Sequence, residues 1–222
     1  MGDNKQAARF RRDFLNKGYY APAREALTRL VQTRLEALPE RAGRLLDVCC
    51  GEGWYTSALA RIPGLEVWGF DLAREMVRLA AKRGGASYFA ANLAHIPVRS
   101  GSFDFATLLF APFQEKELCR VLVPGGRLFW VGPGRRHLYG LKQAVYDRPY
   151  ENDEALPKAG TLRLLGTEKV RGQITLACPE DIRAVFQMTP YYYRTSPADR
   201  AKLERYETLD TEIEFVIAEY ER

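Results

Sequence analysis

The stretch from Leu45 to Gly53, which reads Leu-Leu-Asp-Val-Cys-Cys-Gly-Glu-Gly, constrains the fold of this chain more than any other. A hydrophobic strand ends at the acidic residue Asp47, and small residues and glycines lead into the next helix. A second apolar run ends in Asp71, eighteen residues after Gly53. In α/β sheets such a pairing binds a nucleoside, because a turn with few side chains admits the ligand and a carboxylate accepts the ribose hydroxyls.

The spacing within this turn distinguishes between cofactors. A dinucleotide turn reads G-x-G-x-x-G, but this chain has Asp47 and Trp54 near the points where the first and third glycines are needed. The turn reads D-x-x-C-G-x-G instead, the form seen in S-adenosylmethionine (AdoMet) methyltransferases. The spacing therefore favours AdoMet over NAD(P) as the cofactor.

The order of apolar and amphipathic segments predicts an α/β fold. It indicates a doubly wound, mostly parallel, seven-stranded sheet (class I methyltransferase, Rossmann-like) with an antiparallel C-terminal strand over 210–220. A strand or hairpin is expected over 163–176, and a helix over 72–83 that buries Leu72. The expected parallel strands cover 45–48, 66–70, 87–91, 103–110 and 127–131.

No clear linker divides the chain. We assign 1–40 to an N-terminal basic and aromatic segment with a helix, and 41–222 to the methyltransferase domain. An insertion is expected around 147–178, with a polar, flexible part over 150–160.

Composition sets limits on partners and location. The net charge of +5 permits an anionic partner such as RNA without requiring one. The four cysteines form no C-x-x-C pair and no Cys/His cluster, so we expect free thiols, no metal and a cytoplasmic location. No apolar run reaches the ~18 residues of a membrane span, so no membrane partner is expected. A homodimer is left open.

Residues at the ends of the first three strands are candidates for cofactor binding. Asp47 is placed within reach of the AdoMet amino group, while Cys49, Gly51 and Gly53 are small enough for close approach of its methionyl part. Asp71 would accept the ribose hydroxyls, with Leu72 beside it; Asp71 could equally cap the following helix. At the end of the third strand, the adenine would meet Asn92 and Leu93, although Asn92 is also a common turn former.

Two later segments are candidates for binding the acceptor. Phe110, Pro112 and Phe113 follow the fourth strand, where the transferable methyl would lie, and could stack on an acceptor ring; they could equally be core aromatics. The Asn/Asp-Pro-Pro-Tyr pattern is absent, which argues against exocyclic amino groups of adenine or cytosine. After the fifth strand, Arg135 and Arg136 could hold phosphates, or could belong to a solvated basic loop. No catalytic residue can be named.

Together these residues resemble the bacterial large-subunit ribosomal RNA guanine-N1 methyltransferases of the RlmA type. The resemblance covers nearly the whole chain, and its most specific segments are Pro133–Leu138 and Gln187–Pro190. It implies a class I methyltransferase fold, AdoMet binding, ribosomal RNA as partner and N1-methylguanine in a hairpin as product. By matching motif it implies these cofactor-pocket residues: Tyr20, Gly51, Glu52, Gly53, Tyr55, Thr56, Asp71 and His137.

The chain departs from that family in two respects. Cys49 stands where the family has Gly, which should narrow the turn slightly. The family also carries an N-terminal zinc module of Cys and His ligands, and this chain begins just after the point where that module would end. Two alternatives therefore stay open: a small-molecule AdoMet-dependent methyltransferase, and an AdoMet-binding protein without catalysis.

Overall fold

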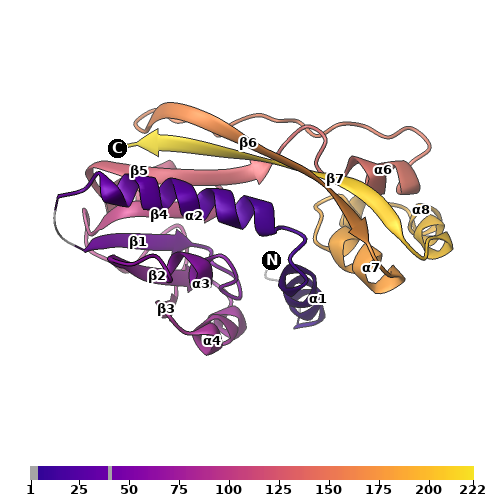
Figure 1. The fold of residues 1–222 in the computed structure, drawn as a ribbon, viewed down its shortest axis with the longest axis horizontal. Helices are drawn as coiled ribbons and strands as arrows, with labels where there is room; N and C mark the ends of the chain where they lie inside the picture. The colour runs from indigo at the N-terminus through magenta and orange to yellow at the C-terminus, as the bar shows by residue number, and fades with distance from the viewer. Residues whose placement is uncertain (1–4, 40–41) are drawn as a thin grey trace.

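The computed structural model describes residues 5–39 and 42–222, with the backbone alone for residues 5–9. Within these residues, seven strands form one sheet in the order β3-β2-β1-β4-β5-β7-β6 (Figure 1). The strands are β1 (Gly43–Val48), β2 (Leu65–Asp71), β3 (Ser87–Ala90), β4 (Phe103–Leu109), β5 (Leu122–Pro133), β6 (Arg163–Leu176) and β7 (Leu209–Glu221). The helices are α1 (Lys5–Asn16), α2 (Ala21–Glu36), α3 (Thr56–Leu59), α4 (Arg74–Arg83), α5 (Glu115–Val121), α6 (Tyr139–Val145), α7 (Pro179–Gln187) and α8 (Pro197–Ala201), with the 3-10 turns η1 (Tyr192–Arg194) and η2 (Lys202–Arg205).

The direction of the strands confirms the predicted topology. β1 to β5 run parallel, and β7 is antiparallel to both of its neighbours, β5 and β6. The register sets Asp47 of β1 opposite Gly69 on one side and Thr107 on the other. Because the carboxyl ends of parallel strands meet at one edge, the segments singled out in the sequence come together there.

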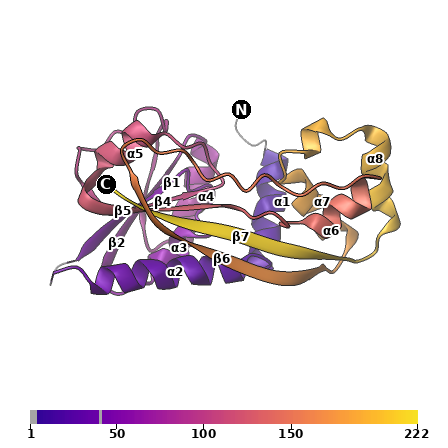
Figure 2. The same ribbon diagram turned by 90° about the horizontal axis from the view of Figure 1, so that it is seen from above.

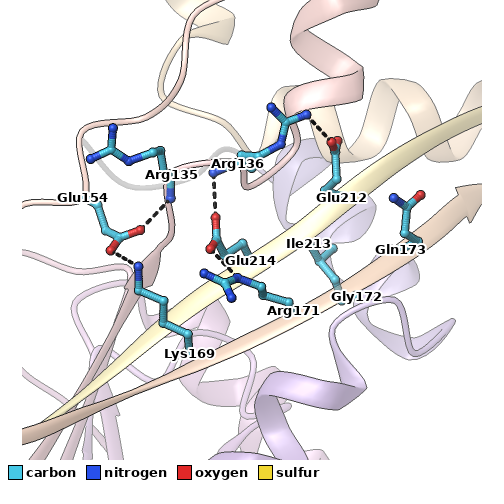
Figure 3. Close-up of a pocket in the computed structure, with 10 residues that line it drawn as sticks. All are labelled: Arg135, Arg136, Glu154, Lys169, Arg171, Gly172, Gln173, Glu212, Ile213 and Glu214. Atoms are coloured by element: carbon cyan, nitrogen blue, oxygen red, sulfur yellow. Dashed lines mark hydrogen bonds and ion pairs between the residues drawn. The ribbon is translucent and has the colours of Figure 1, made fainter.

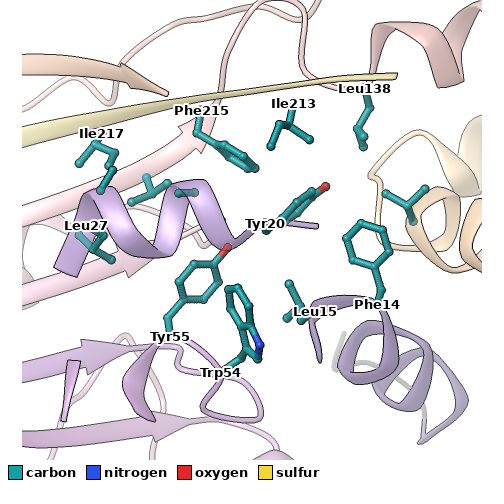
Figure 4. Close-up of a cluster of buried hydrophobic side chains, with 14 of the residues drawn as sticks. Phe14, Leu15, Tyr20, Leu27, Trp54, Tyr55, Leu138, Ile213, Phe215 and Ile217 are labelled. Carbon is teal, nitrogen blue, oxygen red and sulfur yellow. The ribbon is translucent and has the colours of Figure 1, made fainter. Parts of the chain in front are cut away.

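Two hydrophobic clusters lie on opposite faces of the sheet, because successive strand residues point to opposite sides. Leu45 belongs to the first-face cluster and Leu46 to the second-face cluster. Helices α2 and α3 and the C-terminal helices cover the first face, where Figure 4 shows aromatic residues at the centre. The second face is covered by α5 and by the irregular segment 156–162, whose apolar side chains pack near Tyr220.

A second lobe extends from the sheet. β6 and β7 pair with each other over their whole length, but β7 pairs with β5 only from Phe215 onward. The far end of this ribbon carries α6, α7 and α8, and Figure 2 shows α1 between this lobe and the rest of the sheet. Lys17 and Tyr19, just after α1, both contact the buried Asp181 of α7, at 2.5 Å and 2.7 Å. The segment that follows α1 therefore ties the lobe to the core.

One local expectation differs from the structure. The helix expected over 72–83 begins at Arg74, so Leu72 lies outside its inner face and is 64% exposed rather than buried. The helix that follows the cofactor turn is limited to α3, and turns flank it on both sides. The strand expected over 163–176 is confirmed as β6. The irregular part before β6 is held by hydrogen bonds that Gly160 and Leu162 donate to Glu115 and that Tyr220 donates to the carbonyl of Pro157.

Candidate functional site

The carboxyl edge of the sheet concentrates backbone strain. Among the described residues, the three non-glycine residues with positive φ are Cys49 after β1 (58°), Phe110 after β4 (53°) and Leu138 in the loop after β5 (57°). Residues held in the left-handed region persist only where the surroundings over-determine them, and such residues cluster at functional sites. The strained positions follow three of the five strands whose ends the sequence predicted to bind cofactor or acceptor.

Asp47 is buried beneath this edge of the sheet and links two segments of it. It is only 1% exposed, and its two carboxylate oxygens accept hydrogen bonds from the hydroxyls of Thr56 (2.5 Å) and Thr107 (2.7 Å). Burial raises its pKa to about 6, although the two hydroxyl donors act in the opposite direction. Asp47 thus ties the cofactor turn to β4, and its predicted contact with the AdoMet amino group stays a prediction.

The two glycines of the turn have different surroundings. Gly53 packs against α4, where an added Cβ would lie 2.9 Å from the Cβ of Ala80. Gly51 has a φ of 56° and faces open space, with no atom within 4 Å of an added Cβ. Its N–H donates to Asp71 Oδ2 at 3.0 Å. The turn therefore presents a backbone surface beside a half-buried carboxylate.

The ends of β2 and β3 also carry predicted site residues. Leu72 lies on the surface beside Asp71, whose Oδ1 accepts from the Ala73 N–H. Asp71 therefore closes the short turn before α4, while Ala73 rather than Asp71 occupies the N-cap position. Asn92 is exposed and its Oδ1 accepts from the Ala94 N–H, which is the turn-forming role that we kept open. Leu93 packs partly against the second-face cluster.

Glu52 is bonded to α4. One of its oxygens accepts two hydrogen bonds from Arg83, at 2.5 Å and 2.8 Å, and the carboxylate lines a cavity of about 390 Å³ between α1 and α4. Arg12 of the basic N-terminal segment lines this same cavity.

Tyr20 and His137, 117 residues apart in sequence, form a buried pair. Tyr20 Oη lies 3.1 Å from His137 Nε2, and His137 Nδ1 accepts from the Glu214 N–H at 3.3 Å. Burial lowers the pKa of His137 to about 3, so its ring is neutral. Because Nδ1 is an acceptor in a neutral ring, Nε2 carries the proton and donates it to Tyr20. The phenolic proton of Tyr20 then remains for another acceptor.

Aromatic residues surround this pair. Phe215 of β7 packs against Tyr20, with ring centroids 4.9 Å apart, and against His137 at 4.7 Å. Phe110 is 48% exposed and lies 5.9 Å from Phe215. Figure 4 shows Tyr20, Tyr55 and Phe215 in one cluster. Of the other predicted acceptor residues, Pro112 is exposed and Phe113 packs near Tyr220 on the second face.

Arg135 and Arg136 lie on a different surface (Figure 3). They line a cavity of about 580 Å³ formed with the outer face of the β6–β7 ribbon. The Arg136 guanidinium contacts Glu212 at 2.6 Å, and both guanidiniums lie 3.6 Å from Glu151. These charges are therefore compensated within the protein and are separated by β7 from the face that carries Phe215.

The residues at the carboxyl edge fit AdoMet. The open backbone at Gly51, the carboxylate of Asp71 and the exposed Leu72 offer a cradle, an acceptor for ribose hydroxyls and an apolar surface. In addition, the buried hydroxyl of Tyr55 has no hydrogen-bond partner within the described part of the chain. A buried polar atom without a partner indicates a missing ligand or water.

Several residues of the site were not found from the sequence. Thr107 could have been noticed, because it is a polar residue inside the apolar run of β4. Others have no local signal, since their roles depend on contacts between segments far apart: Lys142, Asn152, Glu214 and Phe215.

Within residues 5–39 and 42–222, no helix is both long and apolar enough to cross a membrane. No group of three or more His, Cys, Asp or Glu side chains in the same residues is arranged to hold a metal ion.

Comparison with known proteins agrees with the cofactor half of this site. Residues 45–126 match the family described as "Methyltransferase domain". Demethylmenaquinone methyltransferases are similar to this chain: that of Bacillus velezensis is 30% identical over 48% of this chain and 52% of its own length. That of Thermus thermophilus is 34% identical over 53% and 59%, respectively. The chain thus spans about half the length of these two relatives. They give no support to the narrower resemblance to rRNA enzymes.

Solved structures agree on the fold. The YcgJ protein of Bacillus subtilis has a TM-score of 0.54 at 14% identity, with 88% of this chain and 97% of that chain covered. The [4+2]-cyclase SpnF has a TM-score of 0.55 at 21% identity, with 89% and 80% covered. A cyclase on this fold shows that the fold alone does not determine the reaction. The strand order, the cofactor turn and the family match together show that this chain contains a class I methyltransferase domain whose cofactor is AdoMet.

Proposed function

We propose that this chain transfers the methyl group of AdoMet to a small molecule, and that the acceptor is a planar ring compound bound beside Phe110 and Tyr20. The names of the demethylmenaquinone methyltransferases, which state a quinone as acceptor, support this class of acceptor. The observation that carries the proposal is the buried Tyr20–His137 pair among aromatic rings. It offers one fixed polar group in an apolar wall, which is typical of small-molecule sites.

The protein contributes mainly binding and positioning. Bound AdoMet supplies a methyl group that its sulfonium already activates. Gly51, Asp71 and Leu72 would hold the nucleoside, and Asp47 keeps the turn aligned with β4 through its two threonines. Tyr20 would donate its remaining proton to a ring oxygen or nitrogen of the acceptor and so fix its orientation.

The same geometry restricts the acceptor. His137 has its Nδ1 lone pair occupied by the Glu214 N–H, and both oxygens of Asp47 are occupied by hydroxyls. Burial also raises the pKa of Tyr20 well above its usual range, so Tyr20 acts as a donor rather than a base. None of these three residues is arranged to remove an acceptor proton. The site therefore favours an electron-rich ring, such as a hydroquinone, whose ionised hydroxyl activates the attacked carbon, while the proton displaced from that carbon passes to water.

A second candidate acceptor is a guanine of large-subunit rRNA. The observation that favours it is the sequence resemblance in Pro133–Leu138 and Gln187–Pro190, both outside the matched range 45–126. The compensated charges of Arg135 and Arg136 weigh against it, because phosphates would have to compete with Glu151 and Glu212.

One assay separates these acceptors. AdoMet with a labelled methyl group is incubated with the protein and either a reduced 1,4-naphthoquinone or protein-free large-subunit rRNA, the latter followed by reverse transcription. We expect label in the naphthoquinol, reduced at least tenfold by Tyr20→Phe and unchanged by Tyr193→Phe, which alters an exposed ring. A reverse-transcription stop at one guanine, with no labelled quinol, would replace the first acceptor by the second. Label in neither, with AdoMet binding confirmed by calorimetry, would refute both.

A further inference from the structure

A buried lysine lies next to the site and has no role in the function proposed above. Lys142 of α6 is 1% exposed, and burial lowers its pKa. Its Nζ donates to the carbonyl of Tyr150 (3.0 Å) and to Oδ1 of Asn152 (2.6 Å), and lies 4.0 Å from the centre of the Tyr150 ring. Burying an ammonium is unfavourable unless it is well bonded. Both partners belong to the irregular segment before β6, so the role of Lys142 follows from its contacts with that segment.

Lys142 sets the orientation of the Asn152 amide. Since Oδ1 accepts from the ammonium, Nδ2 is the donor end of the side chain. Nδ2 donates to the carbonyls of Gly134 (3.0 Å) and His137 (2.9 Å), and the Asn152 N–H donates to the carbonyl of Arg135 (2.8 Å). One asparagine thus bonds to three carbonyls of the loop that carries His137.

The opposite side of this loop is held by β7. The carboxylate of Glu214 accepts from the Arg136 N–H at 2.7 Å (Figure 3), and its N–H donates to the His137 ring. The carbonyl of Glu212 accepts from the N–H of Leu138, the residue with a φ of 57°. The strained backbone beside His137 is therefore fixed on both sides.

From these contacts we propose that Asn152, oriented by Lys142, is a positioning residue for His137, so that the segment 150–154 belongs to the acceptor site. The consequence for the reaction rests on the proposed function, because it requires Tyr20 to contact the acceptor. Glu214, Lys142 and Tyr20 face the His137 ring from β7, α6 and the start of α2. With the carbonyl of His137 fixed, its ring has one direction and one tautomer, and the Tyr20 hydroxyl has one orientation.

The experiment reads the His137 ring directly in the full chain without cofactor or acceptor. The chain has two histidines, so His95→Gln leaves His137 as the only histidine ring signal in ¹⁵N NMR. We expect a persistent Nε2 proton and a neutral ring down to about pH 4. Asn152→Ala should broaden that proton signal beyond detection and raise the pKa of His137 by at least one unit toward its ordinary ~6.5. The control is Asp153→Ala, an exposed neighbour, which should change neither.

The outcomes separate this inference from the proposed function. An unchanged ring signal in folded Asn152→Ala would overturn the inference whatever the acceptor is. If that variant does not fold, Asn152→Asp keeps an oxygen for Lys142 and replaces the amide donors by a second oxygen of a charged carboxylate, so the same proton signal is read. With the acceptor found by the labelling assay, kcat/KM should fall at least tenfold in Asn152→Ala, while the Kd for methylthioadenosine stays within twofold. A loosened ring with unchanged kcat/KM would also overturn the inference.

Discussion

The two ends of the sheet hold their polar groups in different ways. Around β1 and β2 the partners are nearer in sequence: Thr56 bonds Asp47 nine residues away, Gly51 bonds Asp71 twenty residues away, and the most distant, Thr107, bonds Asp47 across 60 residues. Around β5 and β7 they are more distant: Tyr20 meets His137 across 117 residues, and Glu214 meets it across 77. Shorter-range contacts therefore build most of the proposed cofactor side, whereas the proposed acceptor side depends on contacts between segments far apart in the chain.

This difference agrees with the extent of the family match. The matched range, 45–126, contains the cofactor turn and ends early in β5, before the loop that carries His137. Proteins that methylate different acceptors can share the half within 45–126, because this half is expected to contact only AdoMet. Variants of the half within 45–126 and variants of the rest of the chain should therefore differ in the size of their effects and in the property that they change.

The largest effect is expected from Gly53→Ala in the half within 45–126. The φ of 79° is unfavourable for alanine, and the added Cβ would lie 2.9 Å from the Cβ and 3.0 Å from the Cα of Ala80. Strain and overpacking together should lower the free energy of unfolding by about 4 kcal/mol, measured by denaturant titration. Gly51→Ala is the matched control, because its surroundings are open: it should lose no more than ~2 kcal/mol of stability yet weaken AdoMet binding more strongly. Equal losses of stability would contradict the distinction between the two glycines.

The next effect concerns pH and Asp47. Burial raises its pKa from an ordinary ~3.9 to about 6 in the folded protein, so the folded state binds the proton more tightly. Its contribution to stability is full below about pH 4 and is lost as pH rises through 6, a difference of about 3 kcal/mol. The stability of the native protein relative to Asp47→Asn should therefore fall by this amount between pH 4 and pH 7. A parallel pair of stability curves would show that the threonine hydroxyls outweigh burial; Asp153→Asn serves as the exposed control.

The same contrast explains what the sequence could predict. The mostly parallel sheet and the turn after β1 follow from periodicity and local spacing, and the antiparallel strand expected over 210–220 is confirmed as β7. The prediction that Leu72 is buried is wrong because α4 begins two residues later than expected, which is enough to turn a side chain from the core to solvent. Helix and strand interiors have a period, but their ends do not.

The acceptor side could not be built in this way. His137 was singled out, but nothing near it in sequence indicates that Glu214 would meet its ring or that Asn152 would bond its carbonyl. The segment containing Asn152 reads as a polar insertion because its hydrogen bonds are made to another loop rather than within a helix or strand. Arg135 and Arg136 suggested phosphate binding, because the sequence does not show that β7 brings glutamates to them.

A smaller effect is expected from Tyr20→Phe, which removes a contact between distant segments. The variant leaves the buried Nε2–H of His137 without its acceptor, and an unsatisfied buried donor costs about 2 kcal/mol. Denaturant titration should show this loss of stability, while Tyr193→Phe, at an exposed ring, should change stability by less than ~0.5 kcal/mol. A neutral Tyr20→Phe variant would show that this distant contact contributes nothing to stability.

The smallest effect, and the one of opposite sign, concerns Cys49. Its φ of 58° is unfavourable for a side chain with a Cβ, so Cys49→Gly should stabilise the protein by about 1 kcal/mol. The adjacent Cys50 is the internal control: it has no positive φ, and its sulfur lies 3.1 Å from where a Cβ of Gly69 would be. Cys50→Gly should therefore destabilise by about 1 kcal/mol, through lost packing and a more flexible unfolded chain. Opposite signs at neighbouring cysteines would show that backbone conformation, rather than composition, governs the turn; a destabilised Cys49→Gly would mean that packing of the Cys49 side chain outweighs the strain.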